Sequence, residues 1–113
     1  MHELSIVLGI LDIAREQAAK ENAAVIEEIE IDIGCLSTIE MNAFDFAWEQ
    51  AVRDTELKNS IKKVNRISGK AKCLDCAAIF SLENLYDGCP ECGEHFLDIL
   101  EGKELRVRSL TVS

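Results

Sequence analysis

Four cysteines arranged as two pairs constrain this 113-residue chain more than any other feature of its sequence. Cys73 and Cys76 form one Cys-x-x-Cys pair, and Cys89 and Cys92 form a second pair after an intervening segment of 12 residues. Two such pairs at this separation can surround one tetrahedral ion with four thiolates, as structural zinc requires. A zinc ion with four cysteine ligands has no open coordination position, so this site is not expected to catalyse a reaction.

Two other interpretations of the cysteines stay open. Disulfide bonds need an oxidising compartment, and the N-terminus lacks the basic start and the cleavage site of a secretory signal. A rubredoxin-like iron site is the other alternative, because iron also accepts four sulfur ligands in a tetrahedron. The sequence therefore predicts a cytoplasmic protein with reduced cysteines that are available to a metal ion.

The charge is distributed unevenly along the chain. Residues 1–56 contain 13 acids and 3 bases, whereas residues 57–113 contain 8 acids and 9 bases, which gives the formal net charge of −9. Zinc ribbons that bind nucleic acid carry a basic surface, because phosphate contacts dominate their affinity. Neither a nucleic-acid partner nor a membrane is expected, since no apolar run approaches the roughly 18 residues of a membrane span.

Hydrophobic periodicity predicts two helices and three strands outside the cysteine segment. Apolar residues recur at helical spacing from residue 3 to about residue 21, and again over about residues 40–53. Isoleucines alternate with acids in residues 25–33, which indicates a strand with one buried face. Two further strands are expected at residues 57–68 and 104–112.

Three local expectations accompany these elements. The first helix should be buried over much of its circumference, with Leu4, Leu8 and Ile13 on the covered side. Asp32 should lie on the solvated face of its strand. Ser37, with a glutamate three residues later, has the form of a capping box for the second helix.

The predicted fold class is α+β, with two helices packed on a small three-stranded mixed sheet and an inserted four-cysteine zinc-ribbon-like module. The two strands that flank the second helix suit a parallel pairing through a crossover. The terminal strand can rejoin their sheet only if the cysteine module interrupts the main domain. The expected domains are therefore residues 1–69 plus 103–113 and a zinc-binding module of residues 70–102.

The N-terminus offers a second group of potential metal ligands. The amine of Met1, the imidazole of His2 and the amides of His2 and Glu3 lie within one short chelating stretch. Four nitrogens in a plane suit nickel(II) or copper(II), which tolerate square-planar coordination, whereas zinc does not bind well in this way. Chemistry alone does not separate nickel from copper, and an N-terminal histidine is more often incidental than a ligand.

No set of residues suggests an enzyme. The chain shows no Ser/His/Asp combination and no glycine loop for phosphate, so catalysis is not expected. Cys35 is the odd cysteine and is expected to be buried rather than reactive. His95 is expected on the surface, because the four cysteines already complete a metal shell.

Several segments together resemble one known family along the whole chain. They are Met1-His2-Glu3-Leu4-Ser5, Leu36-Ser37 through Phe44, Phe46-Ala47-Trp48-Glu49, the paired Cys-x-x-Cys motifs, and Gly102-Lys103-Glu104-Leu105-Arg106-Val107. In this combination the chain is similar to the HypA family of hydrogenase nickel-incorporation proteins. It departs from the family where Pro-Glu is common in the second helix and this chain has Met41-Asn42, and where the usual Gly-Thr is Asp54-Thr55.

The resemblance implies two metal sites. It places nickel(II) on His2 as the essential ligand, with Met1 and Glu3 contributing backbone nitrogens. It places structural zinc(II) on the four cysteines, Cys73, Cys76, Cys89 and Cys92. It also implies two partners, a GTPase of the HypB type and the immature large subunit of a [NiFe]-hydrogenase.

The expected function is accordingly that of a nickel metallochaperone. Two alternatives are a zinc-ribbon protein-interaction module with no role in nickel transfer and a rubredoxin-like electron carrier. Exposed sheet edges would permit a homodimer. Whether the final nickel acceptor is a hydrogenase or a urease does not follow from the sequence.

Overall fold

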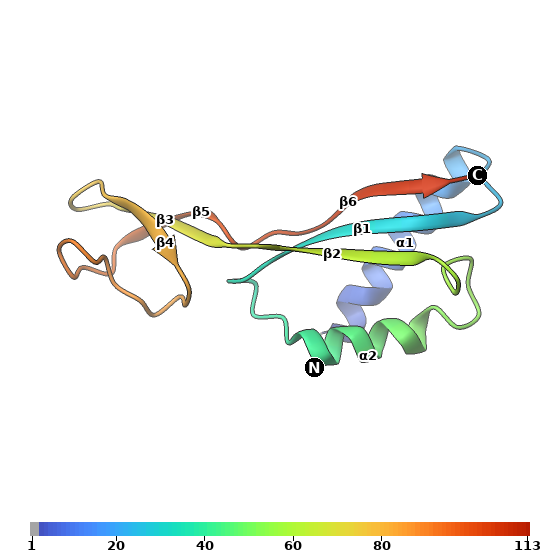
Figure 1. The fold of residues 1–113 in the computed structure, drawn as a ribbon, viewed down its shortest axis with the longest axis horizontal. Coiled ribbons are helices and arrows are strands. Elements are labelled where there is room, and N and C mark those ends of the chain that lie inside the picture. The colour runs from blue at the N-terminus through green and yellow to red at the C-terminus, as the bar shows by residue number, and fades with distance from the viewer. Residues whose placement is uncertain (1–2) are drawn as a thin grey trace. The chain divides into compact units, whose positions relative to one another are not determined.

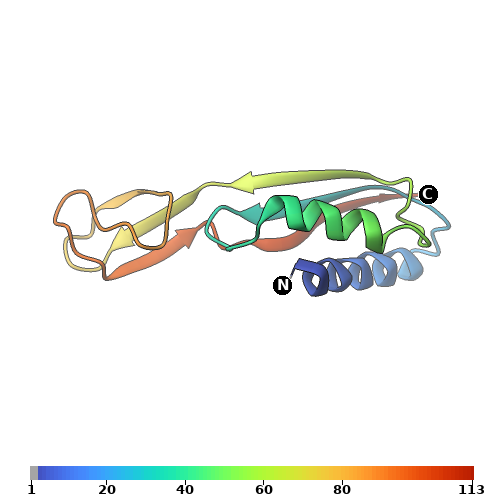
Figure 2. The same ribbon diagram turned by 90° about the horizontal axis from the view of Figure 1, so that it is seen from below.

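The computed structural model describes residues 3–113, so Met1 and His2 lie outside the described residues (Figures 1 and 2). The elements are α1 Glu3–Lys20, β1 Ile26–Gly34, α2 Met41–Ala51, β2 Ile61–Ile67, β3 Gly69–Cys73, β4 Ile79–Leu82, β5 Leu97–Glu101 and β6 Leu105–Val112. They form two sheets, with strand orders β2-β1-β6 and β4-β3-β5. Among these residues, no helix has the length and apolar character needed to cross a membrane.

The chain divides into two compact units. The first unit contains Met1–Ile31, Ile39–Asn65 and Arg106–Ser113, and the second contains Asp32–Thr38 and Arg66–Leu105. The predicted division into a nickel-binding domain and a zinc-binding module of residues 70–102 stays a prediction.

The β2-β1-β6 sheet is mixed, as expected. At the start of β1 and β2, the Ser60 hydroxyl donates to the Ile26 carbonyl. At their ends, the Cys35 N–H donates to the Ile67 carbonyl, so these two strands run parallel. Val25 and Ser113 exchange two backbone hydrogen bonds of 3.1 and 3.0 Å, which starts the antiparallel pairing of β1 with the chain's last strand. The predicted α+β class with two helices and a mixed sheet is confirmed.

Both helices cover the same face of this sheet, and the core of the first unit lies between them and the strands (Figures 1 and 2). Phe44, Ala47 and Trp48 of α2 are buried, as the helical spacing predicts. The Phe44 and Trp48 rings stack with centroids 6.2 Å apart. The Lys62 ammonium lies 5.5 and 5.6 Å from the two ring centroids and bonds the Asp45 carboxylate at 2.7 Å.

The prediction that α1 is buried over much of its circumference is wrong. Leu4, Leu8 and Ile13 are 49%, 47% and 50% exposed. The buried residues form a single stripe of Glu3, Val7, Ile10, Leu11, Ala14 and Ala18. A helix that packs against one layer covers only such a stripe, and additional apolar residues beside it stay accessible to solvent.

Two other local predictions are also wrong. Asp32 is fully buried rather than solvated, and so are Ile31 and Ile33 on either side of it, because both faces of β1 are covered at this end of the strand. Ser37 does not cap α2, since its hydroxyl donates to the Gly34 carbonyl at 2.7 Å. Glu40 is the N-cap residue instead, and its carboxylate accepts hydrogen bonds from the first amides of the helix. Thr38 turns the chain between these two residues with a φ of 63°.

The second unit is built on the antiparallel β4-β3-β5 sheet. Ala71 lies at its centre, opposite Phe80 on β4 and Ile99 on β5. Its small apolar cluster contains Leu36, Ala71 and Leu82, with Phe80, Leu97 and Ile99 packed against them. The Leu36 N–H donates to the Gly102 carbonyl at 2.7 Å, which ties the segment before α2 to this unit.

Candidate metal centre

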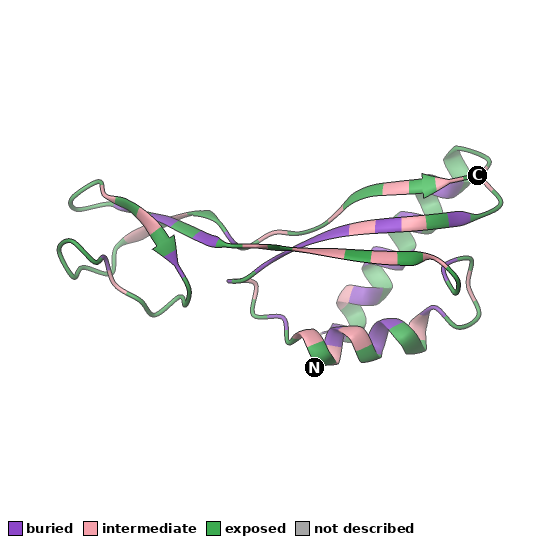
Figure 3. Cartoon of the chain, viewed as in Figure 1, coloured by how far each residue is buried: buried purple, intermediate pink, exposed green. Residues whose placement is uncertain are grey.

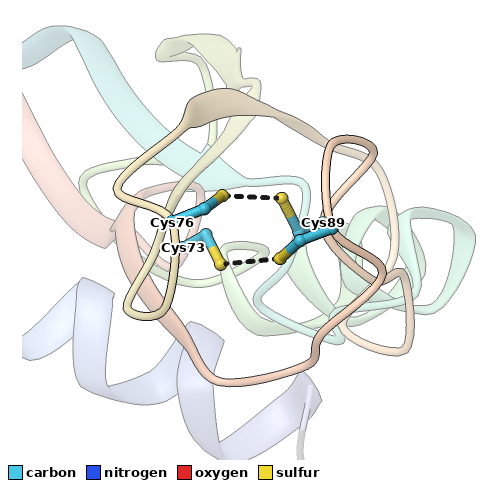
Figure 4. A group of neighbouring side chains, drawn as sticks. Cys73, Cys76 and Cys89 are labelled. Carbon is cyan, nitrogen blue, oxygen red and sulfur yellow. Dashed lines mark hydrogen bonds between the residues drawn. The ribbon is translucent and has the colours of Figure 1, made fainter.

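The first cysteine turn follows β3 directly. The Cys73 N–H donates to the Ala78 carbonyl at 2.8 Å, and the Ala77 N–H donates to the Cys73 carbonyl at 2.9 Å. Ala77 has a φ of 64°, a left-handed conformation that costs an L-residue about 1–2 kcal/mol. This tight turn brings the Cys73 and Cys76 side chains together at one end of the sheet (Figure 4).

The second turn lies between β4 and β5 and repeats the same backbone pattern. The Cys89 N–H donates to the Glu94 carbonyl at 2.9 Å, and the Gly93 N–H donates to the Cys89 carbonyl at 2.8 Å. Gly93 has a φ of 78°, which glycine adopts without steric cost. The Glu91 N–H also lies 3.4 Å from the Cys89 sulfur, where it stabilises a thiolate.

The two turns bring the four predicted sulfur ligands together. The Cys73 and Cys92 sulfurs are 3.6 Å apart, as are the Cys76 and Cys89 sulfurs, and all four lie within 4.8 Å of one another (Figure 4). Four thiolates bound to zinc at about 2.3 Å would form a tetrahedron with edges of about 3.8 Å. Bonded sulfurs would instead be about 2.05 Å apart, so these cysteines are free thiols arranged as ligands of one ion.

The cluster therefore fits a structural zinc site. Each turn contributes one buried cysteine, Cys73 or Cys89, and one exposed cysteine, Cys76 or Cys92. The same four sulfurs would also suit iron, so the identity of the metal depends on more than this geometry.

The thiols of Cys89 and Cys92 differ in pKa. Burial raises the pKa of Cys89, but the N–H groups of Cys92 and Glu91 and the adjacent thiols lower it by more, to about 7. The Glu94 N–H lowers the pKa of Cys92, but burial and the neighbouring thiols raise it to about 12. Because zinc binds thiolates, metal binding releases the protons that these thiols still hold, so the affinity of the site for zinc depends on pH.

The predicted nickel ligands Met1 and His2 lie outside the described residues. Glu3 is described, and its side chain is only 7% exposed. Its carboxylate accepts a hydrogen bond from the Glu40 N–H at 3.4 Å, so it holds the start of α1 beside the N-cap of α2. The structure thus gives the Glu3 side chain an anchoring contact, while its predicted backbone ligand role remains a prediction.

The sequence also predicted the burial of two residues outside the ligand sets, Cys35 and His95, and only one of these predictions is confirmed. Cys35, expected to be buried, is exposed. His95 is exposed, as expected, and it does not belong to the cysteine cluster that the described residues form. Its ring packs close to Gly88, where an added Cβ would lie 3.0 Å from Nε2.

Two contributors to the site were not predicted from the sequence. These are the Glu91 N–H and the positive φ of Ala77. The spacing contained one usable signal, because Ala77 and Gly93 both occur four residues after the first cysteine of their pair. The glycine at one of these equivalent positions indicates the conformation required at the other.

Comparisons with known proteins agree along the whole chain. The family described as "Hydrogenase/urease nickel incorporation, metallochaperone, hypA" matches residues 1–112. The hydrogenase maturation factor HypA of Parabacteroides distasonis is 40% identical over 112 residues, covering 99% of this chain and 97% of the relative. The corresponding factor of Azotobacter vinelandii is 35% identical, with 99% of each chain covered.

A solved structure shows the same fold. The solution structure of the Ni metallochaperone HypA from Helicobacter pylori has a TM-score of 0.71 and 28% identity, covering 99% of this chain and 97% of that chain. With a family match that spans residues 1–112, this chain belongs to the HypA family of hydrogenase/urease nickel-incorporation metallochaperones.

Proposed function

We propose that this protein binds nickel(II) at its N-terminus and delivers it for the maturation of a [NiFe]-hydrogenase. The family match carries this proposal, because it extends over residues 1–112 and includes the Met1-His2-Glu3 start. The protein acts as a carrier rather than an enzyme, and nickel is its cargo.

The proposed cargo site consists of the Met1 amine, the His2 imidazole and the amides of His2 and Glu3. Such nitrogens suit the square-planar coordination of nickel(II). The start of α1 at Glu3 supports this site, because the first amides of a helix donate to no carbonyl of their own helix. The Glu3 carboxylate accepts a hydrogen bond from the Glu40 N–H, which anchors Glu3 at the start of α1.

We assign Cys73, Cys76, Cys89 and Cys92 as the zinc ligands. Their closed tetrahedral set gives zinc no position for a substrate, so the ion serves as a structural cross-link. It joins the turn after β3 to the turn between β4 and β5, and thereby stabilises the second unit.

The proposed partners are a GTPase of the HypB type and the large subunit of a [NiFe]-hydrogenase, met in the cytoplasm. A homodimer through an edge strand of the β2-β1-β6 sheet is also proposed, since β2 and β6 have no second neighbour among the described strands. The net charge of −9 favours basic partner surfaces and attracts cations.

A comparison of the two histidines tests the cargo site. Loss of a second-shell partner typically lowers metal affinity about 10–100-fold, so His2→Gln should lower nickel affinity by more than about 100-fold. Calorimetry on tag-free protein measures this change, and His95→Gln is the matched control. Zinc content and helical circular dichroism should stay unchanged in both variants. Equal nickel affinity in His2→Gln and the parent protein would eliminate this site.

A further inference from the structure

One face of the β4-β3-β5 sheet remains exposed to solvent. Buried and exposed residues alternate along β3 (Figure 3). Ala71 is fully buried and Lys72 is exposed. Lys72 lies opposite Ile79 on β4 and opposite Asp98 on β5, and both of these residues are exposed as well. The alternation therefore places these three side chains together, on the face that points away from the apolar cluster of the second unit.

Large exposed apolar side chains lie on and beside this face. Leu74 follows β3 in the first cysteine turn and Phe96 directly precedes β5, and the Leu74 N–H donates to the Phe96 carbonyl at 2.9 Å, so these two residues are neighbours. Leu74 and Phe96 are 63% and 68% exposed, and Ile79 is 58% exposed. We call Leu74, Ile79, Phe96, Lys72 and Asp98 the outer face. Single exposed apolar residues are common, but three large neighbours form a patch of the kind that marks an interaction surface.

The segment that carries most of this face is acidic. Residues 73–102 contain 7 acidic residues and no lysine or arginine. Lys72 and Lys70 lie on the same face, but they are opposite Asp98 and Glu101. Zinc bound by the four thiolates would add a net charge of about −2 next to Leu74, which follows Cys73 directly.

These charges determine which partners fit. Phosphates of nucleic acids and of anionic lipids are repelled by an acidic surface. A second copy of this chain would bring an equally acidic surface against the first, which opposes self-association through the outer face. A basic protein surface is attracted, and apolar side chains on it could cover Leu74 and Phe96.

We propose that the outer face is a docking surface for a basic protein segment with interspersed apolar side chains. The apolar side chains contact Leu74, Ile79 and Phe96, and the cationic ones pair with exposed carboxylates of the acidic segment, such as Glu94, two residues before Phe96. Apolar contacts at the centre supply most of the affinity, while the charges increase the association rate and select the partner. This inference goes beyond the cargo and holds whether or not nickel binds at the N-terminus.

Two short synthetic peptides test the chemistry of the partner. One alternates leucine with lysine, and the other alternates leucine with glutamate at the same length. Each is titrated into the zinc-loaded full chain while the amide chemical shifts are recorded. The lysine peptide should shift the amides of Leu74, Ile79 and Phe96, and added salt should weaken its binding. The glutamate peptide should leave these amides unchanged.

Matched substitutions test the location. Phe96→Ser should raise the dissociation constant of the lysine peptide by about 10-fold or more, and Leu74→Ser provides a second test of the same patch. Leu8→Ser is the control, because Leu8 is a 47% exposed residue of the other unit. Unchanged zinc content and amide dispersion show that each variant is folded.

Four outcomes would overturn the proposal. They are no binding of the lysine peptide, equal binding of both peptides, shifts confined to other residues, and an affinity that Phe96→Ser and Leu74→Ser leave unchanged. If instead these amides shift with protein concentration in the absence of peptide, the surface joins two copies of the chain and the proposed basic partner is wrong.

Discussion

The two compact units of this protein are stabilised in different ways. The first contains two helices on one face of a mixed sheet, with a buried core that includes Phe44, Trp48 and Ile29. The second has a small apolar cluster around Leu36 and Ala71, and four thiols that fit a zinc ion. An apolar core of this limited size rarely supplies more than about 3–5 kcal/mol, so a zinc ion on the four thiols would add substantially to the stability of the second unit.

Because the two units are stabilised differently, they respond to different conditions. A unit held by apolar packing does not need a bound ion to keep its fold. A unit held by thiolates depends on metal occupancy and on the protonation of its ligands. Perturbations of packing and perturbations of thiols should therefore affect different units.

Loss of a zinc ligand should produce the largest effect. Structural zinc contributes about 10–16 kcal/mol to the folding of zinc-finger peptides, so Cys73→Ser should unfold the β4-β3-β5 sheet. Hydrogen exchange should show loss of amide protection in β3, β4 and β5, with protection retained in α1 and α2. Cys35→Ser is the matched control and should change neither zinc content nor protection. Equal loss of protection in both units would show that they fold as one.

Removal of an aromatic ring from the core should instead destabilise the first unit and leave the second unit unchanged. Phe44 is fully buried, so Phe44→Ala should lower the free energy of unfolding of the first unit by about 3–5 kcal/mol. Phe46 lies on the same helix and is 65% exposed, so Phe46→Ala should cost less than about 0.5 kcal/mol. The emission of Trp48, the single tryptophan, measures both transitions in denaturant. A lower zinc affinity in Phe44→Ala would contradict the separation of the two units.

The sequence predicted the two units unequally. Long periodic patterns identified α1, β1 and α2, because an apolar repeat over many residues indicates both the element and its buried face. The spacing of the cysteines predicted that the four sulfurs lie together, because the number of ligands and the length of each turn can be read from short stretches of sequence. Predictions of which residues beside the core are buried were less successful, since Leu4 and Leu8 are exposed and Asp32 is buried.

The reason is that burial at the margins depends on contacts far apart in sequence. Nothing near Asp32 indicates that its segment joins the unit of residues Arg66–Leu105. Similarly, Ser37 has the spacing of a capping residue, but the turn at Thr38 leaves that position to Glu40. Local patterns specify what an element prefers, and tertiary contacts then decide which preferences are satisfied.

The two cysteine turns allow a finer test within the second unit. Ala77 and Gly93 occupy equivalent positions with φ values of 64° and 78°. Gly93→Ala should therefore destabilise the zinc-loaded unit by about 1 kcal/mol, although a Cβ there meets no atom within 4 Å. Ala77→Gly should stabilise it by about 0.5 kcal/mol, because part of the relieved strain is offset by greater freedom in the unfolded chain. Hydrogen exchange of β3 amides measures both, and changes of equal sign would refute the equivalence.

Acidification should distinguish the units through their charged groups. In the first unit, the N–H of Glu56 itself and then the Arg15 side chain lower the pKa of Glu56 from 4.5. The folded state thus binds the proton less tightly than the unfolded state, so this stabilisation is present above pH 4.5 and is lost as the pH falls through the lower folded pKa. The second unit should respond earlier, because protons compete with zinc for the thiolates.

Glu56→Gln should remove this contribution together with its ion pair, in which Arg15 Nε lies 2.8 Å from the carboxylate. Both side chains are about half exposed, so the expected loss at neutral pH is only about 0.5 kcal/mol. The exposed pair Glu16 and Lys20 provides the control, because its atoms lie 3.8 Å apart and Glu16→Gln should change stability still less. Trp48 emission against pH follows the first unit, and a zinc-sensitive dye follows metal release from the second. Loss of the first unit before zinc release would reverse the order that packing and thiolate chemistry predict.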